Sequence, residues 1–117
     1  MKKLIFIIII CIFSSKIQAY NLQKSNLNLN YPWGMTWIDS TKLLITEKKT
    51  AQIILFDTSN NTSKIISHQI PVAAWGQGGL LDIISENNNV WVTCSIMKNK
   101  LLTTAVYKST LQNDSLV

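Results

Sequence analysis

Short apolar stretches separated by polar turn residues fill the chain from about residue 30 to residue 70. Each stretch spans six or seven residues and is rich in β-branched and aromatic side chains, whereas Asp, Ser, Thr and Asn gather between them. This pattern is typical of strands joined by tight turns. It predicts four strands, at Trp33–Ile38, Lys42–Glu47, Ala51–Asp57 and Thr62–His68, the last with one face toward water.

A second series of stretches follows a glycine-rich segment and keeps the same order. It predicts strands at Leu80–Ile84, Val90–Ser95 and Leu101–Tyr107, with a last strand starting at Leu116 and Val117 after a turn at residues 113–115. Gly34 and Gly79, at the start of each series, are 45 residues apart, and Ile45 and Val92 are 47 apart. The two series are therefore read as two copies of one unit.

A four-stranded antiparallel unit that recurs every 40 to 50 residues is typical of β-propeller blades. A propeller needs about four to eight blades, and a chain of 117 residues holds one blade and most of a second. We therefore expect an all-β fold in which residues 20–117 form the first one to two blades of a larger propeller. A complete β-sandwich of seven strands is the alternative, because the length permits it.

The first 19 residues have the anatomy of a secretory signal peptide. Lys2 and Lys3 give a positive start, Leu4 to Phe13 form an apolar run, and a more polar stretch ends in the small residue Ala19. The run is shorter than the roughly 20 residues that span a bilayer. We expect cleavage after Ala19 and export across the inner membrane, to the periplasm.

Removal of this segment changes the charge of the protein. Three lysines leave with it, and the formal net charge of +5 falls to +2. The remaining lysines are scattered, and the sequence has no Arg, so we expect no nucleic-acid partner and, after cleavage, no membrane association. Cys94 is then the only cysteine, which excludes an internal disulfide, and its apolar neighbours indicate a buried residue.

Three glycines surround one glutamine in the segment VAAWGQGGLLDII, residues 72–84. Gly76, Gly78 and Gly79 allow either a tight turn between strands or a loop that presents the Gln77 amide. The spacing has neither the G-x-G-x-x-G frame nor the lysine of a phosphate-binding loop.

Three motifs resemble the start of the soluble PQQ-dependent sugar dehydrogenases, the glucose/sorbosone dehydrogenase family, which includes periplasmic aldose sugar dehydrogenases. They are YPWGM at residues 31–35, LITEK at residues 44–48 and WGQGGLLDI at residues 75–83. The resemblance implies a six-bladed propeller that holds pyrroloquinoline quinone (PQQ) and calcium near its axis. It also implies oxidation of an aldose sugar at the anomeric carbon and transfer of electrons to an acceptor. The matching glutamine lies at the cofactor and sugar pocket of the family, which makes Gln77 the expected cofactor-binding residue.

The sequence also departs from this family. The histidine base of its later H-x-G-x-R-like motif is absent, and His68 is expected to be a surface or linker residue. Groups for the quinone carboxylates and for calcium would likewise lie in later blades. Trp75 is expected to pack between blades, and Asp82 is expected to make a structural hydrogen bond. The sequence leaves open whether Glu47 is buried or solvated.

The leading hypothesis is therefore an N-terminal fragment of a periplasmic PQQ-dependent aldose dehydrogenase that is inactive alone, with the C-terminal part of the propeller missing. The alternative is a noncatalytic exported protein that binds a glycan or an envelope partner. Several copies of such a protein could complete a ring, because blades need neighbours.

Overall fold

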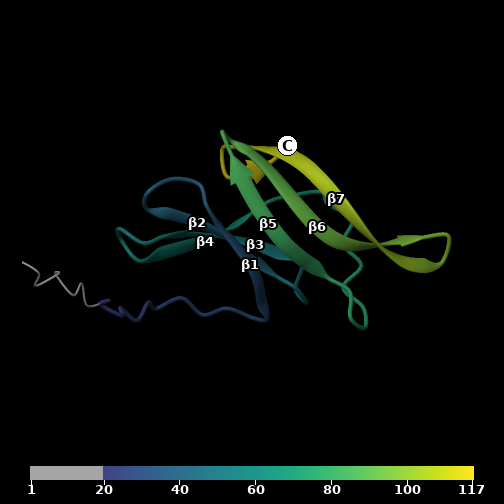
Figure 1. Cartoon of the computed structure of the whole chain (residues 1–117), viewed down its shortest axis with the longest axis horizontal. Coiled ribbons are helices and arrows are strands. Elements are labelled where there is room, and N and C mark those ends of the chain that lie inside the picture. Colours follow the sequence, from purple (N-terminus) through teal and green to yellow (C-terminus); the bar gives the residue numbers. More distant parts are fainter. Residues whose placement is uncertain (1–19) are drawn as a thin grey trace, which may run out of the picture.

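The computed structural model describes residues 20–117, and in that part the chain forms eight strands in two four-stranded antiparallel sheets without a helix (Figure 1). The first sheet contains β1 (Pro32–Trp37), β2 (Lys42–Glu47), β3 (Gln52–Asp57) and β4 (Thr62–Ile66). The second contains β5 (Leu80–Glu86), β6 (Asn89–Lys98), β7 (Leu101–Gln112) and β8 (Ser115–Leu116). The expected signal peptide lies outside the described residues.

Each sheet is a simple meander, with strands paired in the order in which they occur in the chain. The chain enters the second sheet only after the first is complete. A sandwich with Greek-key connections would instead pass repeatedly between its two sheets. The topology therefore confirms two successive four-stranded units and excludes the seven-stranded sandwich for this part of the chain.

The turns of the first sheet follow the polar residues that predicted them. Between β1 and β2, Asp39 Oδ1 accepts hydrogen bonds from the backbone N–H groups of Thr41 and Lys42, at 2.7 and 2.8 Å. These bonds stabilise the carboxylate, the Thr41 N–H contributing most, and lower the pKa of Asp39 to about 2. The turn after β3 contains Asn61 with a positive φ of 58°, a conformation that asparagine tolerates.

The second sheet turns three times on pairs of residues with positive φ. These pairs are Asn87 and Asn88, Asn99 and Lys100, and Asn113 and Asp114. Two consecutive residues in this region make the type I′ turn, whose twist matches that of a β-hairpin. Asparagine in every pair explains why the turns fall where the sequence predicted them.

The strands β6 and β7 are longer than the sequence predicted. Their pairing runs from Asn89 opposite Thr110 to Lys98 opposite Leu101, well past the expected ends at Ser95 and Tyr107. Beyond Ser95 the two strands continue as a ribbon that projects from the sheet (Figure 1). The ladder continues beyond the apolar stretches that set the expected ends, and the turn between the two strands lies at Asn99 and Lys100.

The core lies between the two sheets, where β1 runs beside β5. The two strands approach closely at Gly34: a Cβ there would lie 2.6 Å from Asp82 Oδ1 and 2.9 Å from Asp82 Cα. Buried apolar side chains from both sheets fill the space behind them. They are Leu44, Ile53, Leu55, Ile66, Leu80, Ile83, Val90, Val92, Cys94 and Leu116.

The segment before β1 covers the opposite face of the first sheet. Leu27 and Leu29 pack against a second apolar cluster made by Ile45, Ile54 and Phe56. The segment is therefore a packed part of the fold from Leu27 onward.

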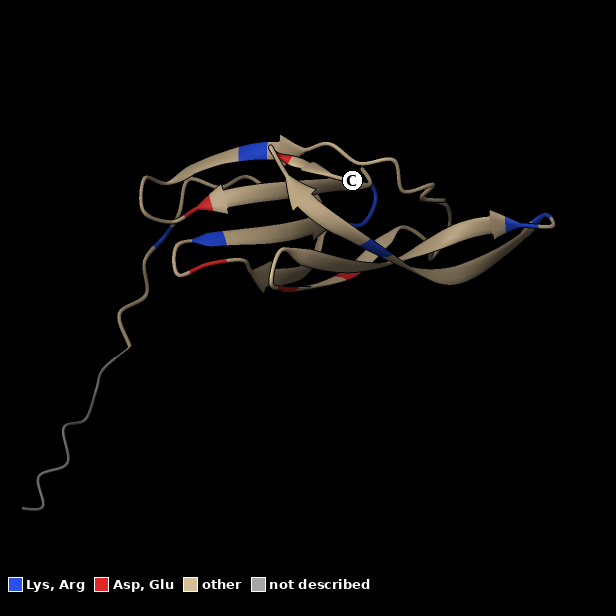
Figure 2. Cartoon of the chain, turned by 90° about the horizontal axis from the view of Figure 1, so that it is seen from above, with Lys and Arg blue, Asp and Glu red and all other residues tan. Residues whose placement is uncertain are grey.

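Charged residues are scattered over both sheets (Figure 2). Within residues 20–117 two ion pairs form, between Lys42 and Asp39 and between Lys64 and Asp114, and both are exposed. No helix in this range is long and apolar enough to cross a membrane.

Candidate functional site

The Gly-Gln-Gly segment forms a tight turn that leads into β5. The Gly78 N–H donates to the Trp75 carbonyl at 2.8 Å, and Gly76 at the second position has a φ of 56°. Gln77 occupies the third position, and its side chain is exposed. The tight turn is thus confirmed, and it is also the element that presents the Gln77 amide.

Backbone contacts fix this turn to both sheets. The Leu80 N–H donates to the Lys48 carbonyl of the first sheet at 3.1 Å, and Ser95 of β6 exchanges hydrogen bonds with Gly79 and Ala73. Gly79 has a φ of 149°, and a Cβ on it would lie 2.1 Å from the Lys48 carbonyl oxygen. Only glycine allows the chain to pass so close to β2.

Two lysines of the β2–β3 turn stand at the same end of the sheets. Lys49 Nζ donates a hydrogen bond to the Gly76 carbonyl, which ties the Gln77 turn to the first sheet. Lys48 is almost fully buried, and its Nζ lies 3.8 Å from the centre of the Trp33 ring, a cation–π contact. Lys49 is exposed, as expected for a surface lysine, whereas the burial of Lys48 differs from that expectation, because no local pattern shows which distant residues it meets.

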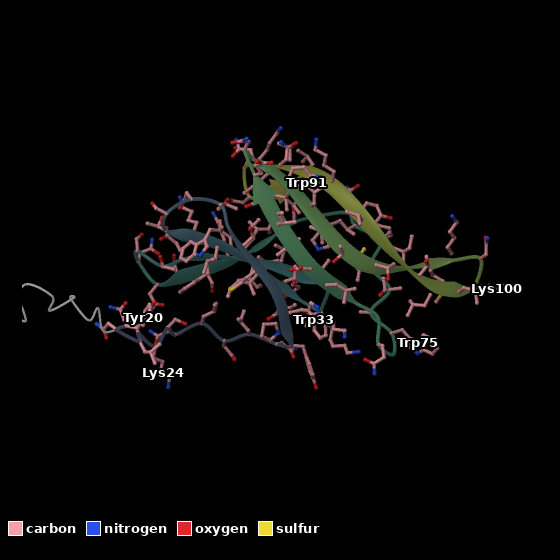
Figure 3. All side chains as sticks on the ribbon, in the orientation of Figure 1. Tyr20, Lys24, Trp33, Trp75, Trp91 and Lys100 are labelled. Carbon is pink, nitrogen blue, oxygen red and sulfur yellow. The ribbon has the colours of Figure 1, made fainter. Side chains whose placement is uncertain are left out.

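Trp75 does not pack between the blades as expected. Trp75 is 72% exposed, and Figure 3 places it on the loop that precedes β5. The prediction was wrong because β5 packs on β1 through Gly34 and Asp82, while Trp75 lies ahead of that contact in a turn that no other strand covers.

The two acidic residues that the sequence singled out have structural partners. Glu47 is buried, and its carboxylate accepts from the Asn30 N–H and the Thr50 hydroxyl at 2.5 and 2.6 Å. Asp82 accepts from the Ile83 N–H at 2.9 Å, the structural hydrogen bond that was expected. Among residues 20–117 no three His, Cys, Asp or Glu side chains are grouped to hold a metal ion.

The histidine and the cysteine stand apart from this turn. His68 Nδ1 accepts from the Ile70 N–H, so its Nε2–H faces the Ala51 carbonyl at 2.9 Å, and both ring nitrogens are occupied. Cys94 is fully buried in the core, and burial raises the pKa of its thiol. Neither residue is placed to act on a ligand of Gln77.

The Gln77 turn and the bound Lys49 together provide a primary amide, an ammonium group and an aromatic ring. Gln77 can donate and accept hydrogen bonds, Lys49 can meet a carboxylate, and Trp75 offers an apolar surface. Such a set suits a planar ligand with carbonyl and carboxylate groups. Within residues 20–117, no histidine or carboxylate hydrogen-bonds to this turn.

The sequence profile of the Glucose / Sorbosone dehydrogenase family matches residues 29–117. The match includes all eight strands and the Gln77 turn. Among curated proteins, no relative matches significantly.

Solved structures of sugar dehydrogenases share the fold. A structure described as glucose dehydrogenase is 27% identical, with a TM-score of 0.67 over 75% of this chain. The apo form of the soluble aldose sugar dehydrogenase of Escherichia coli is 26% identical, with a TM-score of 0.66 over 75% of the chain. The PQQ-bound aldose sugar dehydrogenase of Streptomyces coelicolor is 20% identical, with a TM-score of 0.68 over 79% of the chain.

The present chain spans only 28% of the length of each of these three structures. Its two sheets therefore correspond to a part of each structure, and the architecture is that of partial propeller blades.

Proposed function

The chain belongs to the glucose/sorbosone dehydrogenase family, and from this premise we propose that it forms the N-terminal blades of a PQQ-dependent enzyme that oxidises aldose sugars at the anomeric carbon. The chain spans only 28% of the length of the matched structures. The activity of the whole enzyme is therefore a proposal for this chain.

The observation that carries this proposal is the Gln77 turn. The turn lies within the matched region, and its glycines let the backbone come against β2 while the amide stays accessible. We assign Gln77 to cofactor binding, where its amide would donate to or accept from a quinone carbonyl or a sugar hydroxyl. When bound, PQQ would supply the acceptor for the hydride of the sugar.

The neighbouring residues partly fit such a cofactor. Lys49 is exposed, and only one of its three N–H donors is needed for the Gly76 carbonyl, so it can also meet a quinone carboxylate. Trp75, in the same turn as Gln77, offers an exposed planar surface. For calcium, residues 20–117 provide no carboxylate cluster, and we assign no calcium ligand in this chain.

Proton removal from the sugar needs a base within hydrogen-bond reach. His68 is occupied by two backbone groups, and Glu47 and Asp82 accept from structural donors. The base would therefore come from outside this chain, and the chain alone would be inactive.

We also propose that residues 1–19 direct export to the periplasm.

An activity assay tests this division of roles. The purified protein is mixed with PQQ, calcium and glucose, and reduction of an artificial electron acceptor is followed by its colour change. We expect no turnover, while the E. coli aldose sugar dehydrogenase in parallel confirms that the assay works. Sustained turnover that disappears in Gln77→Ala would overturn the view that the catalytic base lies elsewhere.

A further inference from the structure

The β2–β3 turn, residues 48–51, carries the lysine that contacts the Gln77 turn. Strands β2 and β3 pair up to both of its ends, which makes it a four-residue loop. Lys49 projects from this loop, and its Nζ donates a hydrogen bond to the Gly76 carbonyl. That carbonyl belongs to the peptide group that joins Gly76 to Gln77. The ammonium group therefore contacts the backbone directly beside the proposed cofactor residue.

A buried carboxylate fixes one side of the β2–β3 turn. Glu47, the last residue of β2, is only 4% exposed. One of its oxygens accepts a hydrogen bond from the Asn30 N–H at 2.5 Å, and the other accepts from the Thr50 hydroxyl at 2.6 Å. A carboxylate can accept on both oxygens at once. Glu47 therefore connects the segment before β1 to the residue that follows Lys49 in the turn.

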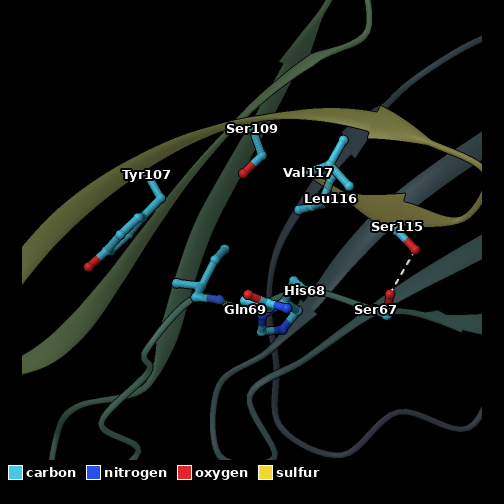
Figure 4. A pocket seen from close by; sticks show the side chains of 9 residues that line it. Ser67, His68, Gln69, Tyr107, Ser109, Ser115, Leu116 and Val117 are labelled. Carbon is cyan, nitrogen blue, oxygen red and sulfur yellow. Dashed lines mark hydrogen bonds between the residues drawn. The ribbon is translucent and has the colours of Figure 1, made fainter.

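The histidine fixes the other side of the same turn. The Nε2–H of His68 donates to the Ala51 carbonyl at 2.9 Å, and Figure 4 shows this ring on the segment that follows β4. Ala51 has a φ of 56°, in the left-handed region that a residue with a Cβ seldom adopts. Such a backbone persists where the surrounding contacts enforce it, and it is frequent at functional sites.

A fixed turn favours the contact that Lys49 makes. The lysine side chain has a long flexible stem, and its restriction to one conformation costs entropy. Because Thr50 and Ala51 are both anchored, the stem starts from a defined position near Gly76. Preorganisation of this kind lowers the entropic cost of forming the hydrogen bond.

We propose that Lys49 is a positioning residue for the Gln77 amide, and that Glu47 positions Lys49 through Thr50. The proposal rests on the assignment of Gln77 to cofactor binding. A displacement of about 1 Å at a binding group can cost about a hundredfold in activity. The bond to the peptide group beside Gln77 therefore affects how well its amide meets an oxygen of the quinone or the sugar. Glu47 acts without touching either ligand.

NMR spectra of the isotope-labelled protein test this connection without any cofactor. Nuclear Overhauser contacts between the Lys49 side chain and Gly76 report the bond, and we expect them in the parent protein. Hydrogen exchange of the Gly78 amide, which donates to the Trp75 carbonyl, reports the order of the turn. Lys49→Met keeps an unbranched stem but cannot donate. It should speed exchange at Gly78 about fivefold to tenfold, the effect of one lost hydrogen bond.

Thr50→Val tests the part played by Glu47, because it removes the hydroxyl that the carboxylate accepts from and leaves Lys49 in place. It should weaken the Overhauser contacts of Lys49 and speed exchange at Gly78 about threefold or more. Two conservative variants should behave as the parent does. Thr50→Ser keeps the hydroxyl, and Lys49→Arg keeps a charged donor.

A matched control separates the hydrogen bond from the loss of a charge. Lys24→Met removes one positive charge at an exposed lysine, which Figure 3 shows far from Trp75. Exchange at Gly78 should stay as it is in the parent. The Leu80 N–H donates to the first sheet where the turn ends. It should exchange equally in all variants, which confirms that each of them is folded.

Three results would overturn the role of Lys49. They are an absence of Overhauser contacts with Gly76 in the parent, parent-like exchange at Gly78 in Lys49→Met, and an equal acceleration in Lys24→Met. The role of Glu47 would be refuted if Thr50→Val kept the contacts of Lys49, or if Thr50→Ser lost them equally. The spectra are recorded without PQQ, so a failure of the cofactor assignment of Gln77 would appear in PQQ-binding measurements and not in these rates.

Discussion

At the residue scale, Thr46 connects the two sheets. It is fully buried in β2; its hydroxyl accepts from the Gly34 N–H of β1 at 2.9 Å and donates to the Leu81 carbonyl of β5. A single hydroxyl thus satisfies a backbone donor in one sheet and an acceptor in the other. Both groups would lose a partner without it.

Thr46→Val tests this connection, because it keeps the shape of the side chain and removes the hydroxyl. We expect the free energy of unfolding to fall by about 1–3 kcal/mol, the cost of leaving buried backbone groups unpaired. Urea denaturation measures it. Thr103→Val, at an exposed threonine of β7, should change stability by less than about 0.5 kcal/mol. Equal effects of the two substitutions would show that the Thr46 hydroxyl does not join the sheets.

At the element scale, the Gln77 turn depends on glycines that differ in their surroundings. A Cβ on Gly79 would lie 2.1 Å from the Lys48 carbonyl oxygen, whereas a Cβ on Gly76 would meet no atom within 4 Å. Both glycines have positive φ, so a side chain added at either position would strain the backbone. Only at Gly79 would the added Cβ also clash with another residue.

A comparison of Gly79→Ala with Gly76→Ala separates the energetic cost of backbone strain from the cost of a steric clash. Gly76→Ala should cost about 1 kcal/mol, from the left-handed backbone alone. Gly79→Ala should cost about 2 kcal/mol or more, and should speed amide hydrogen exchange at Leu80 and Ser95, whose bonds hold the turn. If the two variants were equally stable and equally protected, the close packing of this turn on β2 would be refuted.

The sequence predicted the strand order because alternating apolar residues and asparagine-rich turns are local signals. It did not predict the full length of β6 and β7, since their pairing continues to Lys98 opposite Leu101 and to Asn89 opposite Thr110, beyond the apolar stretches that set the expected strand ends. The burial of Lys48 was also missed, because it depends on contact with Trp33. The sequence left open whether Glu47 is buried, because its burial depends on the segment before β1.

The candidate site was predicted only in part. Glycine spacing and family resemblance singled out Gln77, and the structure shows the turn that presents it. The bond from Lys49 to Gly76 and the exposure of Trp75 depend on how the two sheets meet.

At the scale of the whole molecule, the two sheets are neighbouring blades with unequal outer faces. Leu27 and Leu29 cover the outer face of the first sheet, whereas Ile84 and Val106 on the second sheet are 61% and 65% exposed. The family relation is the basis of the central proposal, that the chain supplies one wall of a quinone site through Gln77.

A chimeric enzyme tests this claim most directly. Residues 29–117 replace the matching region of the E. coli aldose sugar dehydrogenase, and PQQ-dependent glucose oxidation is measured for the chimera, for Gln77→Ala and for the control Gln52→Ala in β3. The account predicts an active chimera in which Gln77→Ala lowers kcat/KM about tenfold or more, while Gln52→Ala has little effect. A folded chimera that does not bind PQQ, or one whose activity is unchanged by Gln77→Ala, would contradict it.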